Sequence, residues 1–294
     1  QEGGAAFMAA AYAKVTGKPG ICFVTRGPGA TNASIGVHVA KQDSVPMILF
    51  VGQVSVSSMN RNAFQEIDIP AMFKPLAKWA VQIDDVDRLP ELLTRAIKIA
   101  TSGRPGPVVI SIPEDMQNEL AKAPDVAPNI PIVAGPMPDQ IDRLGTLISQ
   151  AERPVIMLGA STWTSEACDQ IAEFAKRHDI PVLAGFRCQD KIDNDHPNYV
   201  GNIGAGTPPY ITGLINESDL FICLGVELSE IVTQGYSQFT FPKMQQTLVH
   251  VHPEEEELGR IYQPELAIQS GMAEFAASVA DKTFDVKSKR AANI

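Results

Sequence analysis

Short apolar runs alternate with longer segments of helical period along this chain, and this alternation constrains the fold more than any other feature. It predicts parallel sheets covered by helices on both faces. Strands are expected at ICFVT (21–25), PMILFVGQ (46–53), AKWAVQI (77–83), PVVISIP (107–113), PVIMLG (154–159), IPVLAG (180–185), DLFICLG (219–225) and TLVHVH (247–252). Helices are expected over 3–15, 30–41, 86–100, 139–151, 165–178 and 271–280, and residues 59–73 are expected to be irregular.

The length of 294 residues favours two domains, each large enough to bury its own core. The proline-rich stretch KAPDVAPNIPIVAGPMP marks a linker, so the predicted division is 1–120, a linker over 121–138, and a Rossmann-like domain over 139–294. We predict that both domains are doubly wound, mainly parallel, three-layer α/β/α structures. Ligands bind such sheets beyond the carboxyl ends of the strands, which directs attention to the loops that follow them.

Composition restricts the partners. A formal net charge of −10 argues against nucleic acid or an anionic membrane surface, and no apolar run is long enough to span a bilayer. The four cysteines form no CxxC pair, and Cys22 and Cys223 lie in apolar runs that suit buried reduced thiols. We therefore expect a cytoplasmic protein. Because the first residue is not Met, a targeting segment that has been removed is the alternative.

Glu2 stands at the start of an apolar helix, directly before small residues. A carboxylate there interacts favourably with the helix dipole, so one interpretation is a helix cap and the other is a reactive group. The loop TRGPGATN (25–32) follows a strand and precedes a helix. Its glycines, Pro28 and Asn32 could approach a phosphate, but the pattern is neither G-x-G-x-x-G nor a P-loop, and a plain turn is the alternative.

Five segments occur in a familiar order: QEGGAAFMAAAYAKVTGKPG, TRGPGATNA, QDSVPMILFVGQV, AFQEID and SGRPGPVVISIPED. Together they resemble the pyrimidine-binding domain of thiamine-diphosphate enzymes of the acetolactate synthase-like group. The second half, with LVHVHPEEEELGRIY, resembles the central domain of the same enzymes. The resemblance covers nearly the whole chain and implies a transferase or lyase that acts on 2-keto acids.

The resemblance also implies roles for individual residues. The glutamate matching Glu2 hydrogen-bonds the aminopyrimidine of thiamine diphosphate and promotes deprotonation of the thiazolium carbon, so Glu2 is the expected catalytic and cofactor-binding residue. An apolar setting would raise its proton affinity. Pro28 and Asn32 would line the pyrimidine pocket. Phe64 and Gln65 would reach the substrate side, with a loop anchor and a solvated polar residue as the alternatives.

The sequence departs from the synthase pattern at two places. It reads IPED where the synthases have IPKD, so Glu114 replaces a basic residue near the expected active-site entrance. In the central domain GVELSE, with Glu227 and Glu230, stands where flavin-binding synthases carry Arg and paired Asp. Acidic residues beside a flavin diphosphate weigh against FAD. Arg104 matches a position used for flavin, and a structural arginine is the alternative.

The remaining motifs favour structural interpretations. His250 and His252 project from one face of a strand, but no third metal ligand is evident, and we predict no metal site in this chain. His38, His178 and His196 suit surface or packing positions. The glycines of GNIGAGTPPYITG (201–213) follow no clear strand, so we expect a flexible loop, with a vestigial nucleotide pocket as the alternative. The acidic run 254–257 is expected to be a solvated helix start.

The resemblance implies that a third domain carries the Mg²⁺ and diphosphate site in a GDG motif, which this sequence lacks. We therefore expect a fragment that is inactive by itself, from a homodimer or homotetramer whose site forms between subunits. A non-catalytic α/β nucleotide-binding module is the competing hypothesis. The sequence leaves open the keto acid, the acceptor, the choice between carboligation and decarboxylation, and any regulatory subunit.

Overall fold

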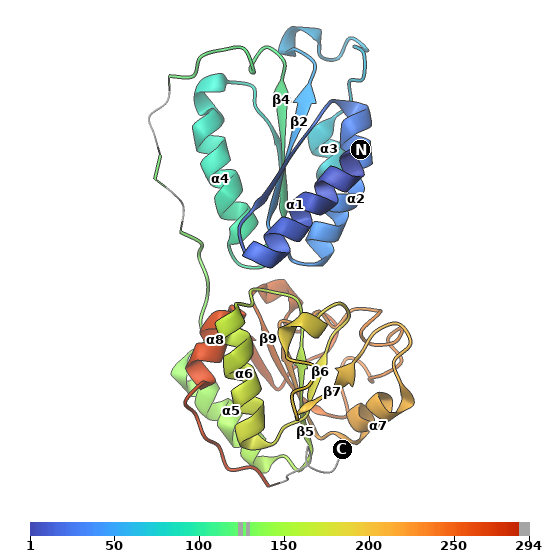
Figure 1. The fold of residues 1–294 in the computed structure, drawn as a ribbon, viewed down its shortest axis with the longest axis vertical. Helices are drawn as coiled ribbons and strands as arrows, with labels where there is room; N and C mark the ends of the chain where they lie inside the picture. The colour runs from blue at the N-terminus through green and yellow to red at the C-terminus, as the bar shows by residue number, and fades with distance from the viewer. Residues whose placement is uncertain (123–125, 128–129, 288–294) are drawn as a thin grey trace. The chain divides into compact units, whose positions relative to one another are not determined.

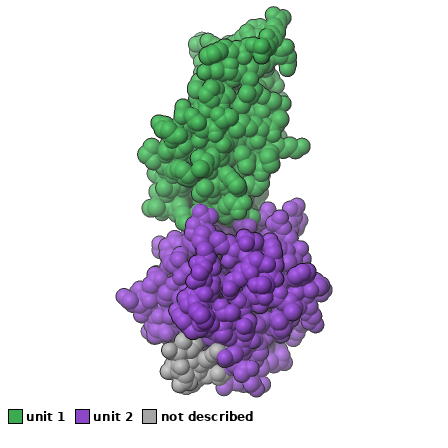
Figure 2. Space-filling model, turned by 90° about the vertical axis from the view of Figure 1, so that its right-hand side faces the viewer, with its two compact units in different colours: residues 1–132 green, residues 133–294 purple. Residues whose placement is uncertain are grey.

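The protein consists of two compact units, residues 1–132 and 133–294, coloured separately in Figure 2. The computed structural model describes residues 1–122, 126–127 and 130–287. The division after Ile132 falls inside the stretch expected to be a linker, part of which lies outside the described residues. The predicted domain limits 1–120 and 139–294 stay a prediction.

The first unit contains a parallel sheet of four strands in the order β1-β2-β4-β3. Its strands are β1 (Gly20–Val24), β2 (Met47–Gln53), β3 (Trp79–Gln82) and β4 (Pro107–Pro113), all within the predicted segments or overlapping them. Strand β1 lies at an edge of the sheet, and its Phe23 stacks on Phe50 of β2 with ring centroids 4.5 Å apart. Cys22 of this strand is buried, as its apolar run predicts, whereas Ile21 and Phe23 are exposed.

Helices cover both faces of this sheet (Figure 1). Apolar side chains of α1 (Glu2–Thr16), α2 (Gly27–Gln42) and α3 (Ile69–Phe73) form one core with the sheet, and those of α4 (Leu89–Thr101) form the other. Helix α1 ends at Gly17, whose φ of 69° is the left-handed cap that the sequence predicts. Helix α3 lies inside the segment expected to be irregular, because Asp68 caps it and Pro70 stands in its first turn.

Helices α1 and α2 pack unusually closely. A Cβ added at Gly36 of α2 would lie 2.4 Å from Cβ of Ala6, which is completely buried. A Cβ at Gly20 of β1 would lie 2.0 Å from the Ala9 carbonyl oxygen. The small residues of α1 and its neighbours therefore allow backbone-to-backbone packing, and this brings the first turn of α1 beside α2.

The second unit contains a parallel sheet of six strands in the order β10-β9-β8-β5-β6-β7. The chain moves outward through β5, β6 and β7 and returns to the other side through β8, β9 and β10, which is the doubly wound arrangement. Helices α5, α6 and α8 cover one face, and α7 with residues 226–244 and Tyr262 covers the other (Figure 1). The elements are α5 (Pro138–Gln150), β5 (Pro154–Leu158), α6 (Ser165–His178), β6 (Val182–Ala184), β7 (Tyr199–Asn202), α7 (Pro209–Glu217), β8 (Leu220–Leu224), β9 (Thr247–His252), β10 (Leu266–Gln269) and α8 (Met272–Val279).

The predicted fold class is confirmed: both units are parallel sheets between helical layers. The flexible-loop prediction for 201–213 was wrong in part, because Gly201 lies in β7 and residues 209–213 belong to α7. Strand β10 was also missed. The acidic run forms only a short 3-10 turn, Glu255–Glu257, and is not simply a solvated face, since Glu257 is buried and pairs with Arg260 at 3.2 Å.

The histidines and cysteines mostly serve packing. His250 and His252 are buried on one face of β9, and Nε2 of His250 lies 2.8 Å from the Val226 carbonyl oxygen. Cys22 and Cys223 are buried free thiols, as expected. Within the described ranges, no group of three or more His, Cys, Asp or Glu side chains is arranged to hold a metal ion. No helix of those ranges combines the length and apolarity needed to cross a membrane.

Candidate functional site

Glu2 and Asn32 meet where the first turn of α1 lies beside the second turn of α2. The Asn32 side chain donates a hydrogen bond from Nδ2 to Oε2 of Glu2 at 3.1 Å. Gly3 permits the contact, because a Cβ there would lie 3.2 Å from the Asn32 carbonyl oxygen. Two of the predicted site residues are thus brought together, and the small residues after Glu2 serve the α1–α2 contact.

Glu2 is not the capping residue of α1. The side chain of Gln1 takes that position and accepts a hydrogen bond from the Gly4 N–H at 2.8 Å. Glu2 stands in the first turn, where its carboxylate accepts a hydrogen bond from its own backbone N–H and one from Asn32, and both lower its pKa. The expected rise in proton affinity was therefore wrong for this chain by itself, because the carboxylate has donors on one side and solvent on the other.

Pro28 lies in the first turn of α2, which begins at Gly27 and not near residue 30. The prediction of a separate RGPG turn was wrong, because proline suits a first helical turn, where its missing N–H costs no hydrogen bond. Pro28 is exposed, and its carbonyl oxygen accepts a hydrogen bond from Oγ1 of Thr31 at 2.9 Å. It is one turn of helix from Asn32.

Phe64 and Gln65 lie in a loop that is fixed by several hydrogen bonds between residues 60 and 67 and to neighbouring elements. The Gln65 carbonyl oxygen accepts a hydrogen bond from the Gly27 N–H at 3.1 Å, and the Ile67 carbonyl oxygen accepts one from Nε2 of Gln53 at 2.7 Å. Between them, the Glu66 carboxylate accepts hydrogen bonds from the backbone N–H groups of residues 60 and 63, at 2.6 and 3.1 Å. We call residues 63–68 the tethered loop.

The tethered loop presents the side chain of Phe64 outward. Phe64 is 78% exposed, although an aromatic ring of this size normally gains from burial. Gln65 has a φ of 64°, a left-handed conformation that costs a non-glycine residue about 1 kcal/mol or more and persists only where neighbours hold it. A rigid backbone that displays an exposed aromatic ring and an amide is suited to contact a ligand or another protein surface.

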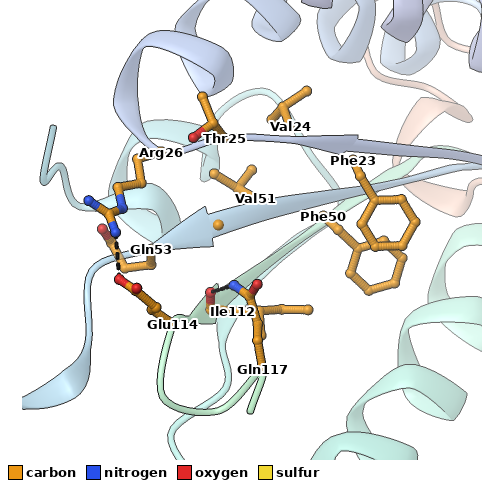
Figure 3. Close-up of a pocket in the computed structure, with 11 residues that line it drawn as sticks. Phe23, Val24, Thr25, Arg26, Phe50, Val51, Gln53, Ile112, Glu114 and Gln117 are labelled. Atoms are coloured by element: carbon orange, nitrogen blue, oxygen red, sulfur yellow. Dashed lines mark hydrogen bonds and ion pairs between the residues drawn. The ribbon is translucent and has the colours of Figure 1, made fainter.

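Arg26 connects the tethered loop to the end of β4, and sequence reasoning did not single it out. Its guanidinium pairs with the Glu114 carboxylate at 2.6 Å and lies 3.5 Å from the Phe64 carbonyl oxygen. Figure 3 shows the pair beside a cavity of about 530 Å³ at the carboxyl ends of β1, β2 and β4, with Phe23, Phe50 and Gln117 among its lining residues. The glutamate at position 114, in place of the basic residue of the synthases, was the available signal, since a carboxylate at that strand end can accept from a nearby cation.

Arg104 lies apart from these residues. It precedes β4, whereas Glu114 follows β4, so the two residues lie at opposite ends of this strand. Its guanidinium donates to Oγ of Ser44 at 2.9 Å and to the Lys41 carbonyl oxygen at 3.1 Å. These contacts stabilise the end of α2, as the structural interpretation of this arginine requires.

Two family models match this chain. Residues 1–72 match the family model for the thiamine pyrophosphate enzyme N-terminal TPP binding domain, and residues 141–279 match that for the thiamine pyrophosphate enzyme central domain. The first match contains Glu2, Asn32 and the tethered loop.

Curated relatives are acetolactate synthases. The chain is 32% identical to an acetolactate synthase of Arthrospira platensis, with 99% of the chain and 52% of the relative aligned. It is 32% identical to the acetolactate synthase large subunit of Corynebacterium glutamicum, over 96% of the chain and 45% of the relative. A probable large subunit from Methanocaldococcus jannaschii is 33% identical, over 91% and 46%. The chain thus spans about half the length of these relatives, and it belongs to the thiamine pyrophosphate enzymes of the acetolactate synthase-like group.

Proposed function

We propose that this chain supplies the pyrimidine-side half of a thiamine diphosphate site, together with the central domain, in an enzyme that acts on 2-keto acids. The observation that carries the proposal is the Glu2–Asn32 contact between the first turn of α1 and the second turn of α2. The close packing of the two helices fixes both side chains, so the pair is preorganised before any ligand arrives.

Glu2 has the proposed role of holding and moving a proton. Its carboxylate has a second oxygen, Oε1, with which it can accept from or donate to a ring nitrogen while Oε2 stays bonded to Asn32. A flat heterocycle laid over this surface would displace water from Glu2, and desolvation raises the pKa of a carboxyl group. Pro28 and Asn32 would form the wall of the pocket. Thiamine diphosphate, when bound, supplies an acidic thiazolium carbon that adds to the keto-acid carbonyl and accepts the electrons released on decarboxylation.

The tethered loop is the proposed substrate side. Phe64 offers an apolar surface, and Gln65 offers an amide that can donate to a carboxylate or a carbonyl oxygen. Their fixed backbone would hold the substrate without reorganisation at the moment of reaction. Whether the second step is carboligation or proton uptake depends on groups that the described residues do not identify.

The other half of the site is proposed to come from a second subunit of a homodimer or homotetramer. There, Mg²⁺ would be held with the diphosphate, since Mg²⁺ binds through carboxylates, waters and substrate phosphates. FAD is not included in the proposal. Glu227, Glu254 and Glu257 act electrostatically on Arg260 near the carboxyl ends of β8 and β9, and this acidic group does not suit a flavin diphosphate.

The test is the Glu2→Gln variant of the full-length protein, assayed for CO₂ release from pyruvate with and without thiamine diphosphate. Glutamine keeps the shape but cannot exchange a proton, so we expect turnover to fall by about 100-fold or more. Glu166→Gln, in the first turn of α6, is the matched control and should retain full activity. Undiminished turnover in Glu2→Gln, or a wild-type protein indifferent to the cofactor, would refute the proposal.

A further inference from the structure

Arg26 links three parts of the first unit. It is the residue before α2 and lies two residues after the end of β1, and its guanidinium reaches both the tethered loop and Glu114 after β4. Arginine suits this position because its separate N–H groups can donate in two directions at once, whereas an ammonium group is a single point. Figure 3 shows the guanidinium turned toward Glu114 across the end of β2.

The backbone next to Arg26 makes the link tight. The following residue, Gly27, donates its N–H to the Gln65 carbonyl oxygen, and a Cβ at Gly27 would lie 2.9 Å from that oxygen. The side chain of Arg26 and the N–H of Gly27 therefore act on consecutive carbonyls, those of Phe64 and Gln65. Because Gln65 has a left-handed backbone, its conformation depends on such external contacts.

We infer that Arg26 is a positioning residue, which fixes the tethered loop by joining it to Glu114 and thereby sets where Phe64 and Gln65 are presented. The inference deepens the proposed function, because it rests on the substrate-side role of that loop. Neither Arg26 nor Glu114 has to touch the substrate. The pair also cancels its own charge, so the loop is held without adding net charge to this edge of the sheet.

The first test is amide hydrogen exchange of the full-length protein, followed over residues 60–66. Partly exposed ion pairs contribute modestly, so we expect Arg26→Gln and Glu114→Gln each to raise exchange about two- to fivefold in this segment. Arg61→Gln, which removes an exposed guanidinium from the neighbouring turn, is the matched control and should exchange like the wild type. Wild-type exchange in Arg26→Gln would overturn the inference.

The second test separates positioning from general damage. In full-length protein with pyruvate, Arg26→Gln should raise KM for pyruvate about fivefold or more, while the concentration of thiamine diphosphate giving half-maximal activity stays unchanged. An equal rise in both concentrations, or a melting temperature far below that of the wild type, would mean a general structural role and would also overturn it. If the wild type shows no cofactor-dependent turnover, the proposed function fails, and the exchange measurement alone decides whether Arg26 fixes the loop.

Discussion

The Asn32 carboxamide donates to the Glu2 carboxylate at 3.1 Å, although 30 residues separate them in the sequence. The contact exists because Gly3, Ala6 and Gly36 let α1 and α2 approach until their backbones nearly touch. A polar pair at the joined ends of two closely packed helices has little freedom to move. Substitutions at Asn32 and Gly36 can therefore test the pKa of Glu2 and the packing of α1 on α2.

The pKa of Glu2 should respond to Asn32. In the folded chain, the Glu2 backbone N–H and then Asn32 lower this pKa below 4.5, because hydrogen bonds to a carboxylate favour its charged form. Asn32→Ala should therefore raise the pKa of Glu2 while leaving it ionised at neutral pH. Carbon-detected NMR titration of labelled glutamate checks this, with Ser34→Ala on the same helix as the control. A pKa that stays at the wild-type value in Asn32→Ala would contradict the pairing.

The close packing of α1 on α2 predicts that replacing the helical residue Gly36 by alanine destabilises the protein. Gly36→Ala replaces a poor helix former by the best one, yet its Cβ would lie 2.4 Å from that of Ala6 and 2.9 Å from the Ala6 backbone. We expect the overpacking to prevail and the free energy of unfolding to fall by about 1–3 kcal/mol.

The control for this prediction is Gly213→Ala in α7. A Cβ at Gly213 would have no atom within 4 Å, so this substitution should raise the free energy of unfolding by about 0.5–1 kcal/mol. Urea denaturation of both variants measures the difference. Stabilisation by Gly36→Ala would show that the two helices are further apart than described.

His178 should make the second unit sensitive to acid. It is buried, its Nδ1 lies 2.8 Å from the Phe174 carbonyl oxygen, and its Nε2 accepts a hydrogen bond from the Phe284 N–H at 2.9 Å. Burial lowers its pKa below 6.5, despite the opposite effect of the bond to Phe174. The unfolded state then binds more protons than the folded state below about pH 6.5, so stability is complete above that pH and declines as the pH falls toward the lowered pKa.

The change that tests this is His178→Gln, which cannot titrate. Between pH 6.5 and 5, the slope of unfolding free energy against pH should decrease by up to about 1.4 kcal/mol per pH unit relative to wild type. His196 and His250, whose pKa values are also lowered by burial, leave a residual slope of the same sign. Calorimetry across this pH range provides the measurement. An unchanged slope in the variant would mean that His178 takes up its proton without disturbing the Phe284 contact.

The thiols should react in order of exposure. Cys223 is completely buried in β8, and burial strongly raises its pKa, so the reactive thiolate is both rare and inaccessible. Cys168 in α6 is only partly buried. Iodoacetamide at pH 8 should label Cys168 first, with Cys223 modified only on unfolding, as mass spectrometry of peptides can follow. Early labelling of Cys223 in folded protein would show that the β8 core opens readily.

Much of the fold was predictable from local sequence. Apolar runs as distinct as MILFVGQ and PVVISIP identify buried parallel strands, because every side chain of such a strand needs an apolar environment. Gly17 and the nearby Pro19 likewise indicated where α1 ends. The elements that were missed, α3, β7, α7 and β10, are short, and their weak patterns acquire structure only against a neighbouring sheet or helix.

The site was predictable only in part. The sequence drew attention to Glu2, Pro28, Asn32, Phe64 and Gln65, and their catalytic and binding roles stay predictions for the experiments above. It could not indicate that Arg26 and Glu114 meet, since 88 residues and three intervening strands separate them along the chain. It also suggested the wrong direction for the pKa of Glu2, because that direction depends on donors and solvent around the folded carboxylate.

The sequence by itself therefore determined the alternation of strands and helices, the α/β class and the family, because these depend on periodicity and ordered motifs that are local to the chain. Only the tertiary structure decided which side chains meet: Glu2 with Asn32, and Arg26 with Glu114. Such meetings depend on strand order and on how closely two helices can approach. Those distances are set by packing across the whole unit and not by any single segment.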